Sequence, residues 1–464
     1  MSYQSYRTIL FNALEYGEKL TFHCKQGDKV ALILPNSIEY LVTYLACTLH
    51  GLTYIPIPHF LSATEINSYL ELFQPKLIVT DRNDLTGDFF PPPHNSKNVF
   101  DSQVFSNRID RLPFTKEDDI ESIYLSSGST GKPKGIMYSY GNKYALIESI
   151  VKGFQFTNQT RHLAFLPFGH TASLNYSVFP SLFCGSYLLN TESFQNIRTS
   201  FFKTISKFKI SYVQTVPTVI SALLMIRENI ENLNLESILF IGCGSAPLSK
   251  SVQEKFYETF QIKLANLYGL SETGPTHFDD PTNLNWEPGS VGKPLSVNEC
   301  KINNDGEILI KGKNVFLGYY KDEASTQESF FGEWFKTGDY GKIINGVLYF
   351  SDRKKDMIII GGINVYPAEI ENVIKQIKKI DECLVFGVED KILNNKIVAY
   401  INSSNLNLKN ENIEKAKIVE HCRSQLSEFK IPSEIYFVKE LPKTPSGKLL
   451  RRIAKENYKK LIDI

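Results

Sequence analysis

The N-terminal part of the sequence alternates between short apolar runs and helical segments. Lys29 to Leu34 predicts a strand, Ser37 to Gly51 a helix, and Leu52 to Ile57 a second strand. A further helix, opened by a capping box at residues 62–65, leads to another strand over Lys76 to Thr80. Strands that alternate with helices at this spacing are typical of a parallel sheet covered by helices. We therefore expect an α/β fold.

The same alternation returns in the middle of the chain, and the pattern then changes twice. Strands are expected near Arg161 to Leu166, Tyr212 to Val216, Ser237 to Ile241 and Lys263 to Leu267, with helices near Leu174 to Phe183, Thr218 to Ile230 and Lys250 to Phe260. From Gly289, short strands joined by Gly and Asn turns predict a β-rich subdomain. A charged run from Asp352 precedes a pattern typical of a separate α+β domain. Because 464 residues are too many for one core, we expect two domains, 1–353 and 354–464.

The composition excludes several classes of protein. A net charge of +1 leaves no large basic field that would indicate a nucleic-acid partner. Seven cysteines occur without a Cys-x-x-Cys pair, so we expect reduced thiols in a cytoplasmic protein rather than a disulfide or zinc framework. The first residues lack a signal pattern, and no apolar run is long enough to cross a bilayer, so we expect no transmembrane segment.

The segment from Ser126 to Gly135 has the composition of a phosphate-binding loop. It follows the apolar run Ile123 to Leu125 and combines hydroxyls, three glycines and two lysines. Glycines let backbone N–H groups approach an anion, and lysines supply positive charge. It is not a Walker A loop, because Lys132 is followed by Pro133. Taken alone, the segment is equally consistent with an ordinary surface loop.

Further candidates follow later in the chain, and each has a plain alternative. Tyr268 and Glu272 lie at a predicted strand end, where they could offer a flat face to a base and an oxygen ligand to Mg²⁺. The alternative is a surface turn. Asp339 could bind two ribose hydroxyls, or belong to a hairpin turn. Lys448 lies in a Pro/Gly-rich loop and could equally be a solvated lysine.

Together and in this order, these motifs resemble the adenylate-forming superfamily, which includes acyl-CoA synthetases, peptide-synthetase adenylation domains and firefly luciferase. The resemblance runs from about Lys29 to about Arg452 and covers the phosphate loop, Gly242–Pro247, Tyr268–Glu272, Thr337–Asp339, Asp352–Pro367 and Pro442–Lys448. It implies a large N-terminal domain of layered sheets and helices with a β-rich subdomain, and a small mobile α+β C-terminal domain that turns about a hinge at Lys355.

The resemblance also implies a reaction and a set of site residues. A carboxylate attacks the α-phosphate of MgATP to give an acyl-adenylate and pyrophosphate, and a thiol then takes the acyl group. The residues implied for the β- and γ-phosphates are Ser126, Ser127, Gly128, Ser129, Thr130, Gly131 and Lys134. Those implied for the rest of the nucleotide are Gly244, Ser245, Ala246 and Tyr268 around adenine, Ser271 at the α-phosphate, and Asp339 and Arg353 at the ribose. Asn266 and Gly269 are implied as further nucleotide-binding residues. Glu272 is implied as the Mg²⁺ ligand, and Lys448 as the cation that bridges carboxylate and α-phosphate.

His170 matches the family position near the acyl carboxylate, and so is implied as a catalytic residue with Lys448, Ser271 and Glu272. The family more often has an aromatic residue just before this histidine, where the chain has Gly169, so the match could slip by one position. The alternative for His170 is a packed core histidine.

The nature of the acid and of the acceptor is less constrained. Amino-acid-activating relatives carry an aspartate where this chain has Thr171, so an α-amino acid is disfavoured. The expected pocket segments, His170–Tyr176, Val213–Val219 and Gly242–Pro247, are mostly small, apolar or aromatic and fit a fatty or aromatic acid. The leading hypothesis is an acyl-CoA synthetase that uses ATP, Mg²⁺ and coenzyme A. The alternatives are a ligase that loads the phosphopantetheine of a carrier protein, and an inactive nucleotide-binding homologue.

Overall fold

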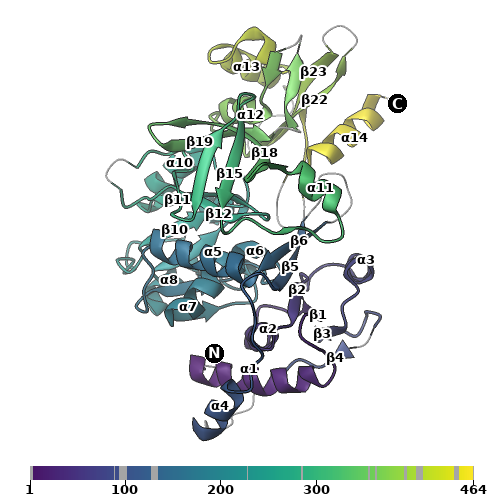
Figure 1. The fold of residues 1–464 in the computed structure, drawn as a ribbon. Coiled ribbons are helices and arrows are strands. Elements are labelled where there is room, and N and C mark those ends of the chain that lie inside the picture. The colour runs from purple at the N-terminus through teal and green to yellow at the C-terminus, as the bar shows by residue number, and fades with distance from the viewer. Residues whose placement is uncertain are drawn as a thin grey trace.

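The computed structural model of the chain describes residues 4–87, 89–93, 102–126, 134–226, 228–283, 286–353, 356–360, 363–390, 394–403, 411–443 and 449–462. The elements near the N-terminus and those near the C-terminus lie at opposite ends of the molecule, with α1 at one end and α13, β22 and β23 at the other (Figure 1). The predicted α/β class, with a large N-terminal part and a smaller C-terminal part, is confirmed.

The first sheet has the strand order β16-β6-β5-β2-β1-β3-β4. Its strands are β1 (Lys29–Ile33), β2 (Thr53–Pro56), β3 (Leu77–Thr80), β4 (Phe89–Phe90), β5 (Ile120–Ser126), β6 (Lys134–Ser139) and β16 (Gly318–Tyr319). The neighbours β1, β2, β3 and β5 pair in parallel, as predicted, and β6 folds back antiparallel on β5. The helices that accompany it are α1 (Tyr6–Thr21), α2 (Ile38–Leu49), α3 (Ala63–Phe73) and α4 (Ser102–Ile109). The predicted capping box between Ser62 and Glu65 is present at the start of α3.

The second sheet has the order β13-β12-β11-β10-β9-β7-β8. Its strands are β7 (Arg161–Ala164), β8 (Tyr187–Asn190), β9 (Tyr212–Thr215), β10 (Phe240–Cys243), β11 (Leu264–Leu270), β12 (Gly274–Phe278) and β13 (Lys293–Pro294). The nearby helices are α5 (Tyr140–Gly153), α6 (Thr171–Ser173), η1 (Leu174–Val178), α7 (Phe179–Cys184), η2 (Phe194–Asn196), α8 (Phe201–Phe208), α9 (Pro217–Ile226) and α10 (Lys250–Phe260). The strands from β8 to β11 run parallel, so their carboxyl ends meet at one edge.

A third, antiparallel sheet follows and matches the expected β-rich subdomain. It consists of β14 (Asn298–Ile302), β15 (Glu307–Gly312), β17 (Phe330–Phe331), β18 (Trp334–Ile344) and β19 (Val347–Arg353), with α11 (Glu323–Glu328) beside it. Asn345 and Gly346 connect β18 to β19, and both have positive φ, 50° and 77°. This backbone matches the twist of the two strands in a tight hairpin. The hairpin aligns Asp339 with Arg353 across the strands.

The C-terminal part is a smaller α+β unit. Its elements are β20 (Ile358–Ile360), β21 (Ile363–Val365), α12 (Pro367–Ile374), β22 (Glu382–Asp390), β23 (Asn394–Asn402), α13 (Glu411–Arg423), η5 (Glu428–Lys430), β24 (Glu434–Phe437) and α14 (Arg451–Ile462). One core cluster lies between α12, α13 and the β22–β23 pair, and a second lies under α14. The division of the chain after residue 353 remains a prediction.

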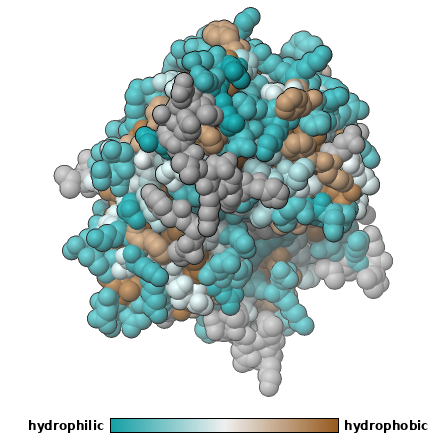
Figure 2. Space-filling view, turned by 90° about the horizontal axis from the view of Figure 1, so that it is seen from below, coloured by the Kyte–Doolittle hydropathy of each residue, from teal (hydrophilic) through white to brown (hydrophobic). Residues whose placement is uncertain are grey.

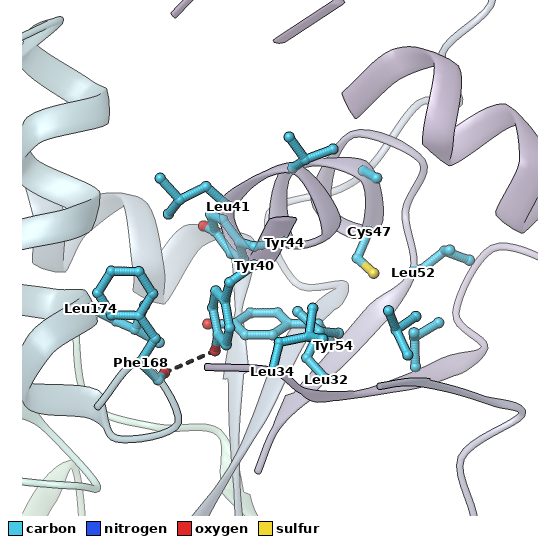
Figure 3. Packing of buried hydrophobic residues seen from close by; sticks show 14 of the residues in the cluster. Leu32, Leu34, Tyr40, Leu41, Tyr44, Cys47, Leu52, Tyr54, Phe168 and Leu174 are labelled. Carbon is cyan, nitrogen blue, oxygen red and sulfur yellow. Dashed lines mark hydrogen bonds between the residues drawn. The ribbon is translucent and has the colours of Figure 1, made fainter. Parts of the chain in front are cut away.

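An aromatic core connects the first sheet to the loop that follows β7. Tyr40 on α2 and Tyr54 on β2 lie in this core, and the hydroxyl of Tyr40 donates a hydrogen bond to the carbonyl oxygen of Phe168 at 2.8 Å (Figure 3). Asn36 accepts from the Phe168 amide at 2.8 Å and donates to the carbonyl of Leu166 at 2.9 Å. These bonds fix the residues that lead into His170.

On the face shown in Figure 2, hydrophobic residues occur as separate patches among hydrophilic ones. Within the described ranges, no helix combines the length and the apolar character that crossing a membrane requires.

Candidate active site

The turn between β11 and β12 holds the polar residues that follow Tyr268. β11 is buried as far as Tyr268, and the residues after it are partly exposed. A Cβ at Gly269 would lie 2.1 Å from the carbonyl oxygen of Gly274, so only glycine fits where the strands approach. This close approach places Ser271 and Glu272 at the carboxyl end of a parallel strand, which is where α/β folds bind ligands.

Hydrogen bonds from other segments hold this turn in place. Tyr138 Oη donates to the carbonyl oxygen of Ser271 at 2.7 Å, and the amide of Phe316 donates to the carbonyl oxygen of Glu272 at 2.8 Å. The Glu272 side chain accepts a bond from Tyr319 Oη at 3.0 Å. Burial raises the pKa of the Glu272 carboxyl, and the bond from Tyr319 opposes that shift. The hydrogen bond therefore holds the Glu272 carboxylate on one side, and the residue as a whole is partly exposed.

The other end of the candidate site consists of Asp339, Arg353 and Tyr268. Asp339 is fully buried, accepts a hydrogen bond from Tyr268 Oη at 2.9 Å, and lies 3.3 Å from Nε of Arg353. Burial raises the pKa of Tyr268, and Asp339 raises it further, so the phenol stays protonated and donates. Tyr268 lies on β11, which leads into the Ser271–Glu272 turn, so one strand connects the two ends of the site. The structure thus brings these predicted residues together.

The predicted adenine segment, Gly244–Ala246, directly follows β10. Ser245 has a left-handed backbone with φ of 68°, and a Cβ on Gly244 would lie 3.0 Å from the carbonyl oxygen of Leu267. Because β10 pairs in parallel with β11, the segment lies beside the strand that leads to Tyr268. The two regions expected on either face of adenine are therefore neighbours.

Two of the predicted binding residues use their side chains within the protein. Asn266 is buried, and its amide donates to the carbonyl oxygen of Ser290 at 2.7 Å. Lys134 Nζ donates to Ser325 Oγ at 2.6 Å and lies 3.4 Å from Oδ2 of Asp322. Asn266 therefore connects β11 to the segment before β13, and Lys134 would have to exchange partners to meet a phosphate.

His170 lies beside an aromatic ring from a distant part of the chain. The ring centroids of His170 and Phe60 are 5.8 Å apart. A Cβ on Gly169 would lie 2.4 Å from Cα of Pro58, so the close approach of these segments requires glycine. Burial lowers the pKa of His170, and its Nε2 atom is buried without a hydrogen-bond partner in the described structure. His170 is therefore a neutral imidazole with unused hydrogen-bonding capacity.

Several predicted residues lie outside the described part of the chain. They are Ser127, Gly128, Ser129, Thr130 and Gly131 of the phosphate loop, the hinge residue Lys355, and Lys448. The side chain of Ser126 is also not described, although its backbone ends β5 opposite Lys134. The described residues Lys443 and Leu449 form an antiparallel bridge.

The residues that support the site could not be predicted from the sequence motifs. Tyr138, Tyr319 and Phe60 belong to none of the motifs, and each contacts a site residue more than forty positions away. Lone tyrosines and phenylalanines carry no local signal for such contacts, so only the tertiary structure identifies them.

The donor set agrees with magnesium as the metal. Among the described residues, no group of three or more His, Cys, Asp or Glu side chains could hold a metal ion by itself. Glu272 offers one carboxylate, with one oxygen bonded to Tyr319. Mg²⁺ is commonly bound by one or two carboxylates together with water and the phosphates of a substrate. The single carboxylate therefore fits a metal that arrives with a nucleotide.

Comparison with known proteins identifies relatives along nearly the whole chain. The family model "AMP-binding enzyme" matches residues 2–320, and "AMP-binding enzyme C-terminal domain" matches residues 369–448. The chain is 30% identical over 447 residues to 2-succinylbenzoate–CoA ligase of Bacillus licheniformis, covering 94% of this chain and 91% of the relative. It is 27% identical to the long-chain-fatty-acid–CoA ligase FadD13 of Mycobacterium tuberculosis, covering 93% and 88%.

Solved structures show the same architecture. o-Succinylbenzoate CoA synthetase of Bacillus subtilis, in complex with its acyl-adenylate intermediate, superimposes with a TM-score of 0.82 at 27% identity and covers 96% of this chain and 92% of that one. The same enzyme in complex with ATP and magnesium ion gives a TM-score of 0.80 at 28% identity, with coverage of 96% and 93%.

Proposed function

Because the chain belongs to the family of AMP-binding enzymes, we propose that it is an acyl-CoA synthetase of the AMP-forming acid–thiol ligase class. It activates a carboxylic acid with ATP and then transfers the acyl group to coenzyme A. In the first step, a carboxylate oxygen bonds to the α-phosphorus, and the bond to the β-phosphate oxygen breaks to release pyrophosphate. In the second, the thiolate of coenzyme A bonds to the acyl carbon, and AMP leaves.

One observation carries this proposal: Tyr268, Asp339 and Arg353 form a bonded group, and Tyr268 belongs to the strand that leads into the turn with Glu272. A carboxylate held by a phenol and a guanidinium has lone pairs for two ribose hydroxyls, which would reach the buried Asp339 once the more exposed Arg353 side chain moves. Glu272 follows Tyr268 by four residues, and we propose that it faces the phosphates of the same nucleotide. The arrangement therefore suits a molecule with a diol at one end and a metal-bound polyphosphate at the other.

The remaining residues would act on the carboxyl–phosphate junction. Both reactants are anions, so the site must neutralise charge while it brings them together. Glu272 would hold Mg²⁺, which neutralises phosphate charge when bound. We propose that Ser271 contacts the α-phosphate and that Lys448 bridges its oxygens and the carboxylate. His170, neutral and with a free ring nitrogen, would donate a hydrogen bond to the carboxylate and orient it.

The C-terminal unit, from residue 354, would serve as a lid that turns about Lys355 between the two steps. Asp352 lies at this junction: its carboxylate accepts bonds from the amides of Arg353 and Ala368, at 2.7 and 2.8 Å, and so connects the end of β19 to the start of α12. The bond to Ala368 would have to break when the lid turns. A Lys355→Pro variant would fix φ at the hinge and should slow thioester formation more than adenylation. Rates unchanged from the wild type in both steps would exclude Lys355 as the pivot.

The acid is proposed to be aromatic or fatty, and the acceptor to be coenzyme A. One relative is named for the aromatic acid 2-succinylbenzoate and another for long-chain fatty acids, so both types of acid occur among the relatives' names. Thr171 offers no carboxylate for a substrate ammonium, which disfavours α-amino acids. We also propose that the enzyme works in the cytoplasm, where its cysteines, all free thiols in the structure, would stay reduced.

Pyrophosphate exchange over a panel of carboxylic acids tests the first step. The proposal expects ATP–pyrophosphate exchange that depends on an aromatic or fatty acid, followed by an acyl-CoA product identified by its mass. Product on a pantetheinylated carrier protein but not on coenzyme A would favour the carrier-loading alternative. Absence of exchange with every acid would indicate a nucleotide-binding protein without catalysis.

A further inference from the structure

Tyr319 lies between the two charged side chains expected to meet the triphosphate. It ends the short edge strand β16, which pairs antiparallel with β6 through Ile136 and Met137. Its hydroxyl donates to Oε1 of Glu272 at 3.0 Å, and the ammonium of Lys134 lies 4.6 Å from the centre of its ring. A single phenol thus contacts the expected metal ligand and the last lysine of the phosphate loop.

We propose that Tyr319 is a positioning residue for the metal-binding carboxylate of Glu272. Its hydrogen bond fixes one carboxylate oxygen and leaves the other to bind the divalent cation that accompanies ATP. Metal-ligating carboxylates are commonly held by such a second bond, and its loss costs roughly 10- to 100-fold in metal affinity. The inference rests on the proposed function, which assigns Glu272 to the metal.

The surroundings of Tyr319 leave its ring little freedom. Its backbone amide donates to Thr326 Oγ1 at 2.8 Å, and its ring meets Phe316 edge-on with centroids 4.9 Å apart. The amide of Phe316 donates in turn to the carbonyl oxygen of Glu272 at 2.8 Å. The segment that carries Tyr319 therefore holds both the backbone and the side chain of Glu272. A ligand held at both places needs no reorganisation when the cation arrives.

The next residue provides a matched control. Tyr320 is also a partly exposed tyrosine, but its hydroxyl accepts a bond from Lys29 Nζ at 2.7 Å and its ring packs 5.9 Å from that of Phe73. Neither contact involves Glu272. Tyr319→Phe and Tyr320→Phe each remove one bonded hydroxyl from adjacent positions, so a general loss of stability would affect both variants.

The test is calorimetric binding of the unreactive analogue α,β-methylene-ATP, measured in excess EDTA and again in excess MgCl₂. The dissociation constant in EDTA divided by that in MgCl₂ gives the contribution of Mg²⁺ to binding. We expect Tyr319→Phe to reduce this ratio about tenfold, while affinity in EDTA changes less than about twofold. Tyr320→Phe should leave both values unchanged, and in a Glu272→Gln background the loss of the Tyr319 hydroxyl should have no further effect.

Two results would overturn the inference while the proposed function stands: an unchanged ratio in Tyr319→Phe, or an equal loss of affinity with and without Mg²⁺. In both cases Glu272→Gln would still lose the Mg²⁺ contribution. If Glu272→Gln kept that contribution, the assignment of Glu272 to the metal would be wrong, and the role of Tyr319 would be wrong with it.

Discussion

The hydroxyl of Tyr268 donates a hydrogen bond to Oδ2 of Asp339 at 2.9 Å, although the two residues belong to different sheets, on β11 and β18. The bond connects the strand that leads to the Ser271–Glu272 turn with the hairpin that carries Arg353. It therefore joins the parts of the site expected to bind the base and the ribose.

Tyr268→Phe should weaken ATP binding. The ring remains, but Asp339 loses a donor to its buried carboxylate, and a hydrogen bond to a charged group contributes about 1.5–3 kcal/mol. We expect KM for ATP to rise about tenfold in pyrophosphate exchange, with KM for the acid little changed. An equal rise in both values would mean that the bond supports the whole fold and not the nucleotide end of the site.

Gly169→Ala should impair binding of the acid. The added Cβ would lie 2.4 Å from the backbone of Pro58, which cannot move aside as a flexible side chain could. The loop that carries His170 must then shift, so KM for the acid should rise about tenfold or more while KM for ATP stays near the wild-type value. An unchanged KM for the acid would show that the loop with His170 does not form part of the acyl site.

Lys448→Ala should separate the two half-reactions. The proposed ammonium acts only where carboxylate and α-phosphate meet, so its removal should abolish pyrophosphate exchange. Thioester formation from a supplied acyl-adenylate should continue at close to the wild-type rate. Loss of both activities to the same degree would count against this assignment.

Stability should fall in mild acid because of buried neutral histidines. His162 is fully buried, and burial lowers its pKa to about 3. An unfolded chain takes up this proton below about pH 6.5, whereas the folded chain does so only near pH 3, so stability falls as the pH decreases between these values. The contribution of His162 to this fall is about 1.4 kcal/mol per pH unit.

His162→Leu removes this titration. Between about pH 7 and about pH 5, the melting temperature of the variant should therefore fall less than that of the wild type. His277 is also fully buried, with its pKa lowered to about 3, so part of the acid sensitivity should remain. If the melting temperatures of the variant and the wild type fell equally with decreasing pH, His162 would have an ordinary pKa in the folded chain.

Much of the fold could be predicted from the sequence because the signals are local. β1 and β3 lie within their predicted runs, and Pro217 occupies the first turn of α9, as its missing N–H favours. The predicted strand over Ser237 to Ile241 is displaced to Phe240–Cys243, since boundaries depend on sheet register. Helix α1 was not predicted, although its buried residues Ile9, Ala13, Tyr16 and Leu20 follow helical spacing and could have indicated it.

The candidate site, too, could be predicted from the sequence only in part. Asp339 and Arg353 are paired across one hairpin, so a motif and a turn together suffice to place them. The contacts between Tyr319 and Glu272 and between Phe60 and His170 depend on how separate layers pack. Such contacts leave no periodic trace in the sequence.

The most direct test of the central claim follows the oxygen atoms of the substrate. The enzyme would be supplied with ATP, coenzyme A and an acid whose carboxylate carries ¹⁸O, and the products would be analysed by mass spectrometry. Attack by the carboxylate on the α-phosphorus predicts one ¹⁸O atom in AMP and none in pyrophosphate. ADP together with ¹⁸O-labelled inorganic phosphate would instead show an acyl-phosphate route and contradict the account.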